Sequence, residues 1–381
     1  PTVGLHPRDT ERLVRVLKDL RDLGNTVLVV EHDLQVIGEA DRVMELGPGP
    51  GDRGGEIVFE GTIKQFRKRR TLTADYLAGR KNVADFARTR SDEPPDVFFT
   101  VKGARHNNLK NADFAFPFRR FTCVTGVSGS GKSSLVCEVL YPHAARRLGS
   151  DNVKRGECDG IDGIEMFDFA EMMGQEALAR NPRANALTFM DMFGPVRQLF
   201  ATTPGAKRRG FGPGAFSFNT AEGRCPKCEG TGRIQIDMQF LADVNVVCDE
   251  CEGRRFQKRI LEVNYRGKSI GDVLELTVEE ALEFFMGSAP LVKKLQTLVD
   301  VGLPYLRIGQ SLDTLSAGEG QRLKIARELL SAGKGCGLFI FDEPTMGLHP
   351  AEVSSFLECV DRLIAQGHSV VVIEHNLDVI A

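Results

Sequence analysis

The chain has 381 residues, a net charge of −3 and a hydrophobic content of 42%. This length accommodates two or three domains with buried cores, and the near-neutral charge excludes a global attraction to nucleic acid. Its longest apolar runs, such as 27–30 and 338–341, span four residues, whereas a membrane helix needs roughly 20. We therefore expect a globular, cytoplasmic protein with no membrane contact, in which any nucleic-acid surface is local.

The two ends of the chain are copies of one segment. With a shift of 343, residues 1–37 and 344–380 are identical at 15 of 37 positions without a gap. Such a match indicates two copies of one domain. An acidic pair precedes the second copy but not the first, so we interpret the chain as part of a longer tandem protein. The identical pairs include Gly4/Gly347, His6/His349, Glu31/Glu374 and His32/His375.

Hydrophobic periodicity predicts an α/β unit in the first 80 residues. Apolar residues at helical spacing predict a helix over 8–23, and the run 26–31 predicts a buried strand. Short strands follow at 42–46 and 55–61, and we assign the basic run 64–70 to a solvated helix. The polar stretch 81–97, which contains Asp-Glu-Pro-Pro, is the predicted linker.

A second α/β domain begins after the linker. Strands are predicted at 98–101 and 121–125, and from about residue 156 to 308 the pattern changes to Gly-rich loops, paired cysteines and helices near 278–286 and 290–300. After this stretch come a helix at 317–331, a strand at 338–341 and the second copy of the repeat. The stretch therefore predicts an insertion that splits a nucleotide-binding core.

The segment 126–133 matches the phosphate-binding pattern G-x-x-x-x-G-K-[ST], directly after an apolar strand and before a helix. Glycines allow successive backbone N–H groups to face phosphate oxygens, the lysine reaches the β and γ phosphates, and the serine hydroxyl can bind Mg²⁺. The alternative is a glycine turn with an incidental lysine. The residues expected to bind ATP and Mg²⁺ here are Gly126, Ser128, Gly129, Gly131, Lys132, Ser133 and Ser134.

Two further patterns fit nucleotide chemistry. Asp342 ends an apolar strand, where its carboxylate can hold Mg²⁺, and Glu343 can polarise an attacking water. Ser316 and Glu319 form a predicted capping box at the start of the helix 317–331. Taken alone, the second pattern predicts only a helix cap.

The paired cysteines have metal spacing. Cys225 with Cys228, and Cys248 with Cys251, supply four thiolates on two knuckles, which suffices for a closed tetrahedral Zn²⁺ site. A structural zinc is favoured over a catalytic one because no coordination position stays open, and disulfides are the alternative. The other five cysteines are scattered in apolar segments, where we expect buried thiols.

The order of these motifs resembles the ATP-binding cassette superfamily. The resemblance implies that Ser316 and Gly318, in L-S-x-G-E, contact the γ-phosphate on the opposite cassette, and that His375 contacts a γ-phosphate as well. It also implies catalytic roles for Glu343 and Lys132. Gln175 is the candidate for the glutamine of the Q-loop, although the segment around it is a poor match.

Together with the P-loop, six segments, one of them within the zinc module, make the resemblance specific to the UvrA family, the damage-recognition ATPases of bacterial nucleotide excision repair and their drug-resistance paralogues. These segments lie at 108–110, 181–188, 216–219, 223–230, 303–310 and 374–380. Ala317 stands where the family has Gly and Gly320 where it has Ala. The divergent stretch 167–179 leaves the Gln175 assignment and the regulation of hydrolysis open.

The resemblance implies five parts. Residues 1–80 would end a first cassette, 81–97 would be the linker, and 98–155 would carry the second P-loop. Residues 156–310 would form an inserted DNA-binding domain with the zinc module at 223–256, and 311–381 would run from the signature to the histidine. The implied cofactors are ATP, Mg²⁺ and Zn²⁺.

Local basic clusters are the candidates for DNA contact, because phosphate binding needs Lys and Arg groups and not a basic whole chain. The implied partners are damaged double-stranded DNA, a second copy of the chain and a UvrB-like helicase. Phe216 and Phe218 could stack on bases, although core packing is favoured. The candidate DNA contacts are Arg180, Arg183, Lys207, Arg208, Arg209, Arg254 and Arg255.

The family's composite sites pair the P-loop of one cassette with the signature of the other. The chain holds one of each, both from the second cassette, so we expect weak hydrolysis unless two chains pair head to tail. Residues 38–63 are also a candidate to complete the second cassette in a permuted arrangement. Alternative functions are a self-resistance protein that displaces DNA-bound drugs, a transporter ATPase and a chaperone-type zinc module.

Overall fold

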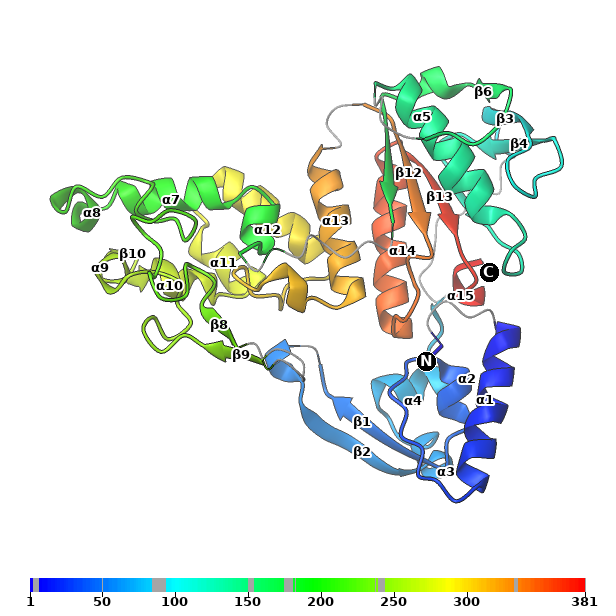
Figure 1. Ribbon diagram of the computed structural model, residues 1–381, viewed down its shortest axis with the longest axis horizontal. Helices are drawn as coiled ribbons and strands as arrows, with labels where there is room; N and C mark the ends of the chain where they lie inside the picture. The colour runs from blue at the N-terminus through cyan, green and yellow to red at the C-terminus, as the bar shows by residue number, and fades with distance from the viewer. Residues whose placement is uncertain are drawn as a thin grey trace. The chain divides into compact units, whose positions relative to one another are not determined.

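The computed structural model describes every residue except 3–6, 50, 84–93, 150–153, 175–180, 182, 237, 239–243, 332–334 and 381. The described residues form two compact units, 1–176 with 328–381 and 177–327 (Figure 1). Most of the predicted linker lies outside the described residues. The five predicted domain ranges stay predictions, and each unit is described by itself.

A four-stranded parallel sheet forms the centre of the first unit. Its order is β5 (Phe121–Val124), β13 (Ser369–Ile373), β12 (Gly337–Asp342) and β7 (Phe169–Met173). Every residue of β13 is buried, which explains the unbroken apolar run in the sequence. The strands predicted at 121–125 and 338–341 are confirmed.

Helices cover this sheet. The helix α14 (Pro350–Ala365) packs against the sheet through a stripe that includes Val353, Phe356 and Val360 (Figure 1). The π-helical segment η3 (Ser134–Leu140) continues into α5 (Tyr141–Arg147) and contributes Val136 and Val139 to the core. The P-loop therefore connects a strand of the parallel sheet to a helical segment, as its sequence context predicted.

A three-stranded antiparallel sheet adjoins the same core, in the order β4 (Ala112–Pro117), β3 (Phe98–Ala104) and β6 (Gly160–Asp162). The rings of Phe99 and Phe116 stack at 5.3 Å between centroids. Both β6 and β7 lie inside the range predicted for the insertion, yet they pair with β3 and β12 of the first unit. The hydrophobic pattern did not separate them from the Gly-rich loops nearby.

The first repeat folds differently from the second. It contains α1 (Pro7–Asp22) and α2 (Leu34–Gly38), but no strand forms over 26–31, where Leu28 and Val30 are 92% and 86% exposed. The prediction of a buried strand there is wrong, because none of the described strands pairs with this run. A strand needs partners for its N–H and C=O groups, and its local sequence does not supply them.

The next elements form their own small core. The strands β1 (Arg42–Gly47) and β2 (Glu56–Thr62) pair antiparallel with each other and with no other described strand. Phe59 and Phe66 pack here with α3 (Ile63–Phe66) and α4 (Leu72–Leu77). The idea that 38–63 completes the second cassette's sheet is therefore wrong. The basic side chains of the run 64–70 are exposed as predicted, but its helix ends at residue 66, whose ring is buried.

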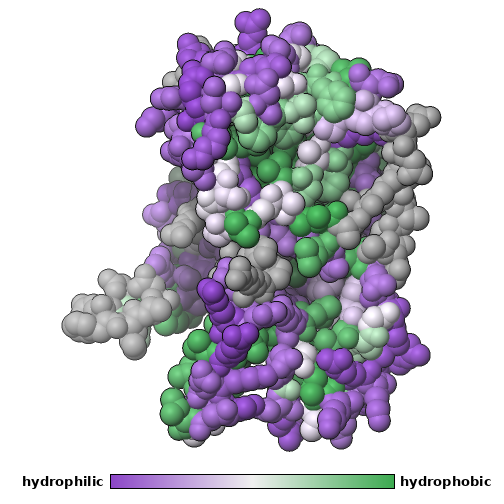
Figure 2. Space-filling model, turned by 90° about the vertical axis from the view of Figure 1, so that its right-hand side faces the viewer, coloured by the Kyte–Doolittle hydropathy of each residue, from purple (hydrophilic) through white to green (hydrophobic). Residues whose placement is uncertain are grey.

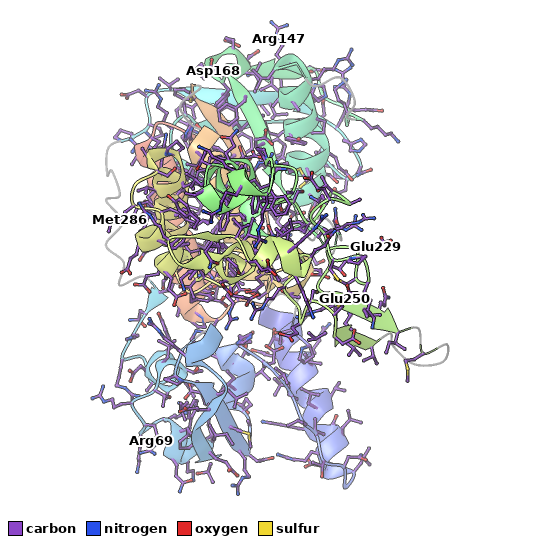
Figure 3. The ribbon with its side chains drawn as sticks, turned by 90° about the vertical axis from the view of Figure 1, so that its left-hand side faces the viewer. Arg69, Arg147, Asp168, Glu229, Glu250 and Met286 are labelled. Atoms are coloured by element: carbon purple, nitrogen blue, oxygen red, sulfur yellow. The ribbon has the colours of Figure 1, made fainter. Side chains whose placement is uncertain are left out.

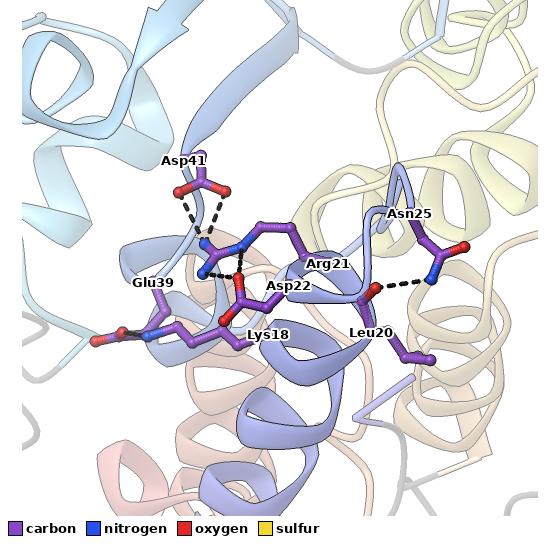
Figure 4. Close-up of polar contacts among 7 residues, drawn as sticks. All are labelled: Lys18, Leu20, Arg21, Asp22, Asn25, Glu39 and Asp41. Atoms are coloured by element: carbon purple, nitrogen blue, oxygen red, sulfur yellow. Dashed lines mark hydrogen bonds and ion pairs between the residues drawn. The ribbon is translucent and has the colours of Figure 1, made fainter.

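Polar contacts anchor α1. Arg21 donates to both carboxylate oxygens of Asp41 at 3.0 Å, and Lys18 pairs with Glu39 (Figure 4). Two apolar side chains of the helix, Val16 at 54% and Leu20 at 43%, are exposed. Figure 2 shows hydrophobic side chains among hydrophilic ones on the surface that lies to the right in Figure 1.

The second unit combines short helices with two hairpins. Its core contains Phe200, Phe216, Phe218, Phe256 and Phe285, all at most 2% exposed. Core packing of Phe216 and Phe218 is thus confirmed. No helix in the described part of the chain has the length and hydropathy to span a bilayer. The elements are α6 (Ala186–Phe189), α7 (Phe193–Ala201), α8 (Pro204–Arg208), β8 (Arg233–Ile236), β9 (Val244–Val247), α9 (Lys258–Leu261), β10 (Asn264–Tyr265), β11 (Lys268–Ser269), α10 (Ile270–Leu274), α11 (Val278–Phe284), α12 (Ala289–Asp300) and most of α13 (Ala317–Ser331).

Candidate functional site

The P-loop runs from the end of β5 to the start of η3. Gly126, Gly129 and Gly131 have φ values of 147°, 76° and 103°, a region in which residues with a side chain are strained. The Lys132 ammonium donates to the carbonyl oxygens of Gly126 at 2.9 Å and Val127 at 3.0 Å. The lysine side chain is therefore folded back onto the P-loop, the loop that is predicted to bind phosphate. Ser128, Ser133 and Ser134 lie in the same loop and first helical turn.

Asn108 supports this loop from the turn between β3 and β4. Its side-chain N–H donates to the Gly129 carbonyl at 2.8 Å, and a Cβ placed on Gly131 would lie 2.8 Å from its side-chain oxygen. A side chain at position 131 would push Asn108 away. The sequence analysis named this residue only within a family motif, and its partner 21 residues away gave no local signal.

The acidic pair lies at the carboxyl end of β12. Glu343 has a φ of 47°, and its backbone N–H donates to the Ile373 carbonyl at 3.0 Å. Its carboxylate lies 3.5 Å from Nε2 of His375, so the structure brings together two of the predicted catalytic residues. Parallel strands end on one edge of a sheet, which is why Asp342, Glu343 and His375 gather beside the P-loop.

Burial and charge tune the groups at this edge. Burial raises the pKa of Asp342 above its usual range, although Cys137 and Lys132 oppose the shift. Burial lowers the pKa of Lys132, although the nearby carboxylates of Glu343 and Asp342 act to raise it. The pKa of the Cys137 thiol rises to about 12 through burial and the nearby Asp342. A carboxylate with a raised pKa gains from a bound cation, which is compatible with the predicted role of Asp342 as a Mg²⁺ ligand.

The predicted signature lies in the unit 177–327. Ser316 and Glu319 form the predicted capping box: the Ser316 backbone N–H donates to the Glu319 carboxylate at 2.9 Å, and the Glu319 N–H donates to the Ser316 hydroxyl at 3.2 Å. The helix α13 begins at Ala317 and contains Gly318 in its first turn. The P-loop belongs to the other unit. Gln175 lies outside the described residues.

The four paired cysteines form one buried cluster. All four sulfur atoms lie within 4.8 Å of one another, and none of these residues forms a disulfide. The Gly232 N–H donates to the Cys228 sulfur at 3.3 Å, as in zinc knuckles. Burial raises the pKa of the Cys251 thiol, so the cluster needs a cation to hold four thiolates together. The donor set and its spacing fit Zn²⁺.

Acidic residues flank the zinc cluster. Glu229, which follows Cys228, and Glu250, which lies between Cys248 and Cys251, are exposed (Figure 3). Lys227 forms an ion pair with Asp249 at 2.6 Å across the two knuckles. The rim of the module is therefore mixed in charge and not basic.

The candidate DNA contacts fall into three groups. Arg255 is 9% exposed, donates to the Gly309 carbonyl at 3.1 Å and stacks on Phe218, so its assignment to DNA is wrong. A guanidinium buried to this extent inside the unit cannot reach a phosphate on a duplex. Ion pairs hold Arg183 to Glu229, Arg209 to Glu262 and Arg254 to Asp272. Lys207 and Arg208, at the end of α8, are exposed, and Arg180 lies outside the described residues.

A P-loop, a strand-end acidic pair and a histidine at one edge of a parallel sheet define a P-loop ATPase core of the ATP-binding cassette type. Sequence comparison then gives the family. The chain is 48% identical to UvrABC system protein A of Escherichia coli strain K12 and 47% identical to that of Aquifex aeolicus, over its whole length in both cases. The chain belongs to the UvrA family.

A solved structure agrees with this assignment. The crystal structure of UvrA2 from Deinococcus radiodurans matches the whole chain with a TM-score of 0.89 at 40% identity, and the match covers 46% of that protein. The chain spans about two fifths of the curated relatives that it matches. No family model matches the chain.

Proposed function

We propose that the chain is the ATP-binding and DNA-binding part of a UvrA-type protein that recognises DNA damage in nucleotide excision repair. The observation that carries this proposal is the edge of the parallel sheet, where Lys132, Asp342, Glu343 and His375 gather, in a chain 48% identical to UvrABC system protein A. The name of the relatives places them in a system with other proteins. A UvrB-like partner and a second copy of the chain are proposed on that basis.

Each residue at the sheet edge has a separate task in this proposal. Lys132 leaves its two loop carbonyls and binds a phosphate oxygen, while Asp342 and Ser133 hold Mg²⁺. Glu343 polarises the attacking water, and His375, 3.5 Å from it, contacts the γ-phosphate. Mg²⁺, when bound, neutralises the charge that develops on the transferred phosphoryl group.

The signature acts in a second copy. Ser316 and Gly318 would bind the γ-phosphate held by another P-loop, so efficient hydrolysis needs two paired sets of motifs. Closure of the pair on ATP would change the DNA groove, and lesions would be detected through DNA deformability. Lys207 and Arg208 are the proposed phosphate contacts, since both are exposed on α8.

Steady-state hydrolysis and DNA binding test the proposal together. Lys132→Ala should reduce hydrolysis by at least about 100-fold, while Lys207→Ala with Arg208→Ala should weaken binding to lesion-bearing duplexes and flatten its salt dependence. Arg255→Lys is not a suitable control because Arg255 is buried. Strong hydrolysis by the monomeric chain, or equal affinity for lesion-bearing and intact duplexes, would contradict the proposal.

A further inference from the structure

The two repeats contain the same hydrogen-bond network around a glutamate. In the second repeat, the Oε1 atom of Glu374 accepts from the Thr345 backbone N–H at 2.9 Å and from its hydroxyl at 2.6 Å. Its Oε2 atom accepts from the backbone N–H groups of His375 at 2.9 Å and Asn376 at 3.0 Å. One carboxylate thus joins the loop after β12 to the loop after β13.

The first repeat reproduces this network at a shift of 343. Glu31 accepts from the Thr2 backbone N–H at 2.7 Å and from its hydroxyl at 2.6 Å. Its second oxygen accepts from the N–H groups of His32 at 3.0 Å and Asp33 at 3.3 Å. Four donors lie at matching positions in the two copies. The repeated sequence therefore determines this hydrogen-bond network, rather than the surroundings of one copy.

The Glu374 network lies next to the proposed chemistry. Glu374 and Thr345 are 3% and 4% exposed, so water cannot replace the hydrogen bonds that they form. Thr345 is two residues from Glu343, and His375 directly follows Glu374. The Glu374 carboxylate therefore fixes the backbone next to Glu343 and next to His375, whose side chains lie 3.5 Å apart.

We propose that Glu374 is a positioning residue that holds His375 and Glu343 in register for hydrolysis. This inference rests on the proposed ATPase function and deepens it, because it adds a residue that touches neither nucleotide nor metal. A Gln at this position would keep one acceptor for Thr345 but present an N–H₂ group to the two N–H donors of His375 and Asn376. Those donors would then lack an acceptor.

The test compares variants of the full-length protein. Glu374→Gln should lower kcat by about tenfold or more and change KM for ATP by less than about threefold, because the P-loop still binds the nucleotide. Thr345→Val should have the same effect. Thr345→Ser, which keeps the hydroxyl, should restore at least about half of the kcat.

A matched control separates positioning from stability. Asp272 accepts a similar pair of hydrogen bonds in the other unit, in the capping box at the start of α10, from the Ser269 N–H at 2.9 Å and hydroxyl at 2.7 Å. Asp272→Asn should lower the melting temperature as Glu374→Gln does and leave kcat within about twofold. Amide hydrogen exchange of the segment 374–377 should be at least about tenfold faster in Glu374→Gln and unchanged in the control.

The outcomes distinguish this inference from the function on which it rests. If wild-type protein does not hydrolyse ATP, or Lys132→Ala hydrolyses it equally well, the proposed function fails and the role in hydrolysis with it, and exchange at 374–377 then tests only whether Glu374 holds the histidine loop. Wild-type kcat in Glu374→Gln, no rescue by Thr345→Ser, or a rise in KM equal to the fall in kcat would overturn the positioning role. Unchanged exchange at 374–377 would overturn it as well.

Discussion

His349 should make the protein sensitive to acid. It precedes α14, where its Nδ1 atom accepts from the Ala351 backbone N–H at 3.2 Å, so Nε2 carries the proton and donates to the Thr73 hydroxyl at 3.0 Å. The rings of Tyr76 and His32 lie 5.8 and 6.1 Å away. A second proton on this imidazole would leave the Ala351 N–H without its acceptor.

The magnitude follows from the pKa of His349. Burial lowers this pKa to about 4, His32 adds to the shift and Glu45 opposes it. A histidine in the unfolded chain has a pKa near 6.5, so the unfolded state binds a proton first as the pH falls. Protonation of His349 does not affect stability above about pH 7.5, where the imidazole is neutral in both the folded and the unfolded state. Stability then falls as the pH decreases through 6.5, by about 2 kcal/mol at pH 5, and the loss is complete below about pH 4.

Two measurements check this prediction. In a ¹³C-histidine-labelled sample, the ring signal that disappears in His349→Asn should titrate with a pKa about 2 units below that of a solvated histidine. Asn keeps the helix cap. Between pH 7.5 and pH 5, the free energy of unfolding should therefore fall by about 1 to 2 kcal/mol less in the variant than in wild type. A ring that titrates near pH 6.5, or parallel pH profiles of the two proteins, would refute the reasoning.

Three further predictions concern packing. In Gly223→Ala the new Cβ would lie 2.1 Å from a backbone carbonyl oxygen beside the zinc cluster. The melting temperature should therefore fall by about 5 °C or more, and bound zinc should be lost. Gly212 has open space around its Cα, so the melting temperature of Gly212→Ala should stay within about 2 °C of wild type. Phe341→Ala empties a fully buried position in β12 and should lower the free energy of unfolding by about 3 to 5 kcal/mol, as read by urea denaturation. Ile373→Thr should lower the free energy of unfolding by about 2 kcal/mol or more, whereas Val30→Thr, at the matching exposed position, should change it by less than about 0.5 kcal/mol. Equal effects of the two substitutions in the same denaturation experiment would contradict the structure.

Local patterns predicted much of the fold. The strand β12 combines an apolar run with a polar end, and the cap of α13 needs only Ser316 and Glu319, so both were visible in a few adjacent residues. The supporting residues Asn108 and Glu374 were not predicted, because their partners lie 21 and 29 residues away. A role that depends on a distant contact has no local signature.

The run 26–31 shows the opposite failure. Its apolar sequence is close to that of β13, and pattern alone predicts a buried strand for both. Only β13 lies between two other strands, β5 and β12, while Leu28 is 92% exposed. Strand formation here depends on the partners that a segment meets, which its own sequence does not encode.

The comparison of the two repeats also bears on the role of Glu374. The Glu31 network forms although 26–31 is not a strand. The hydrogen bonds from threonine and from the residues after glutamate therefore do not require the sheet. What the sheet adds in the second repeat is location, because β13 lies next to β5 and brings His375 to the edge that carries the P-loop. The network fixes the local geometry of the histidine loop, and the sheet brings that loop to the P-loop edge, where we propose that ATP binds.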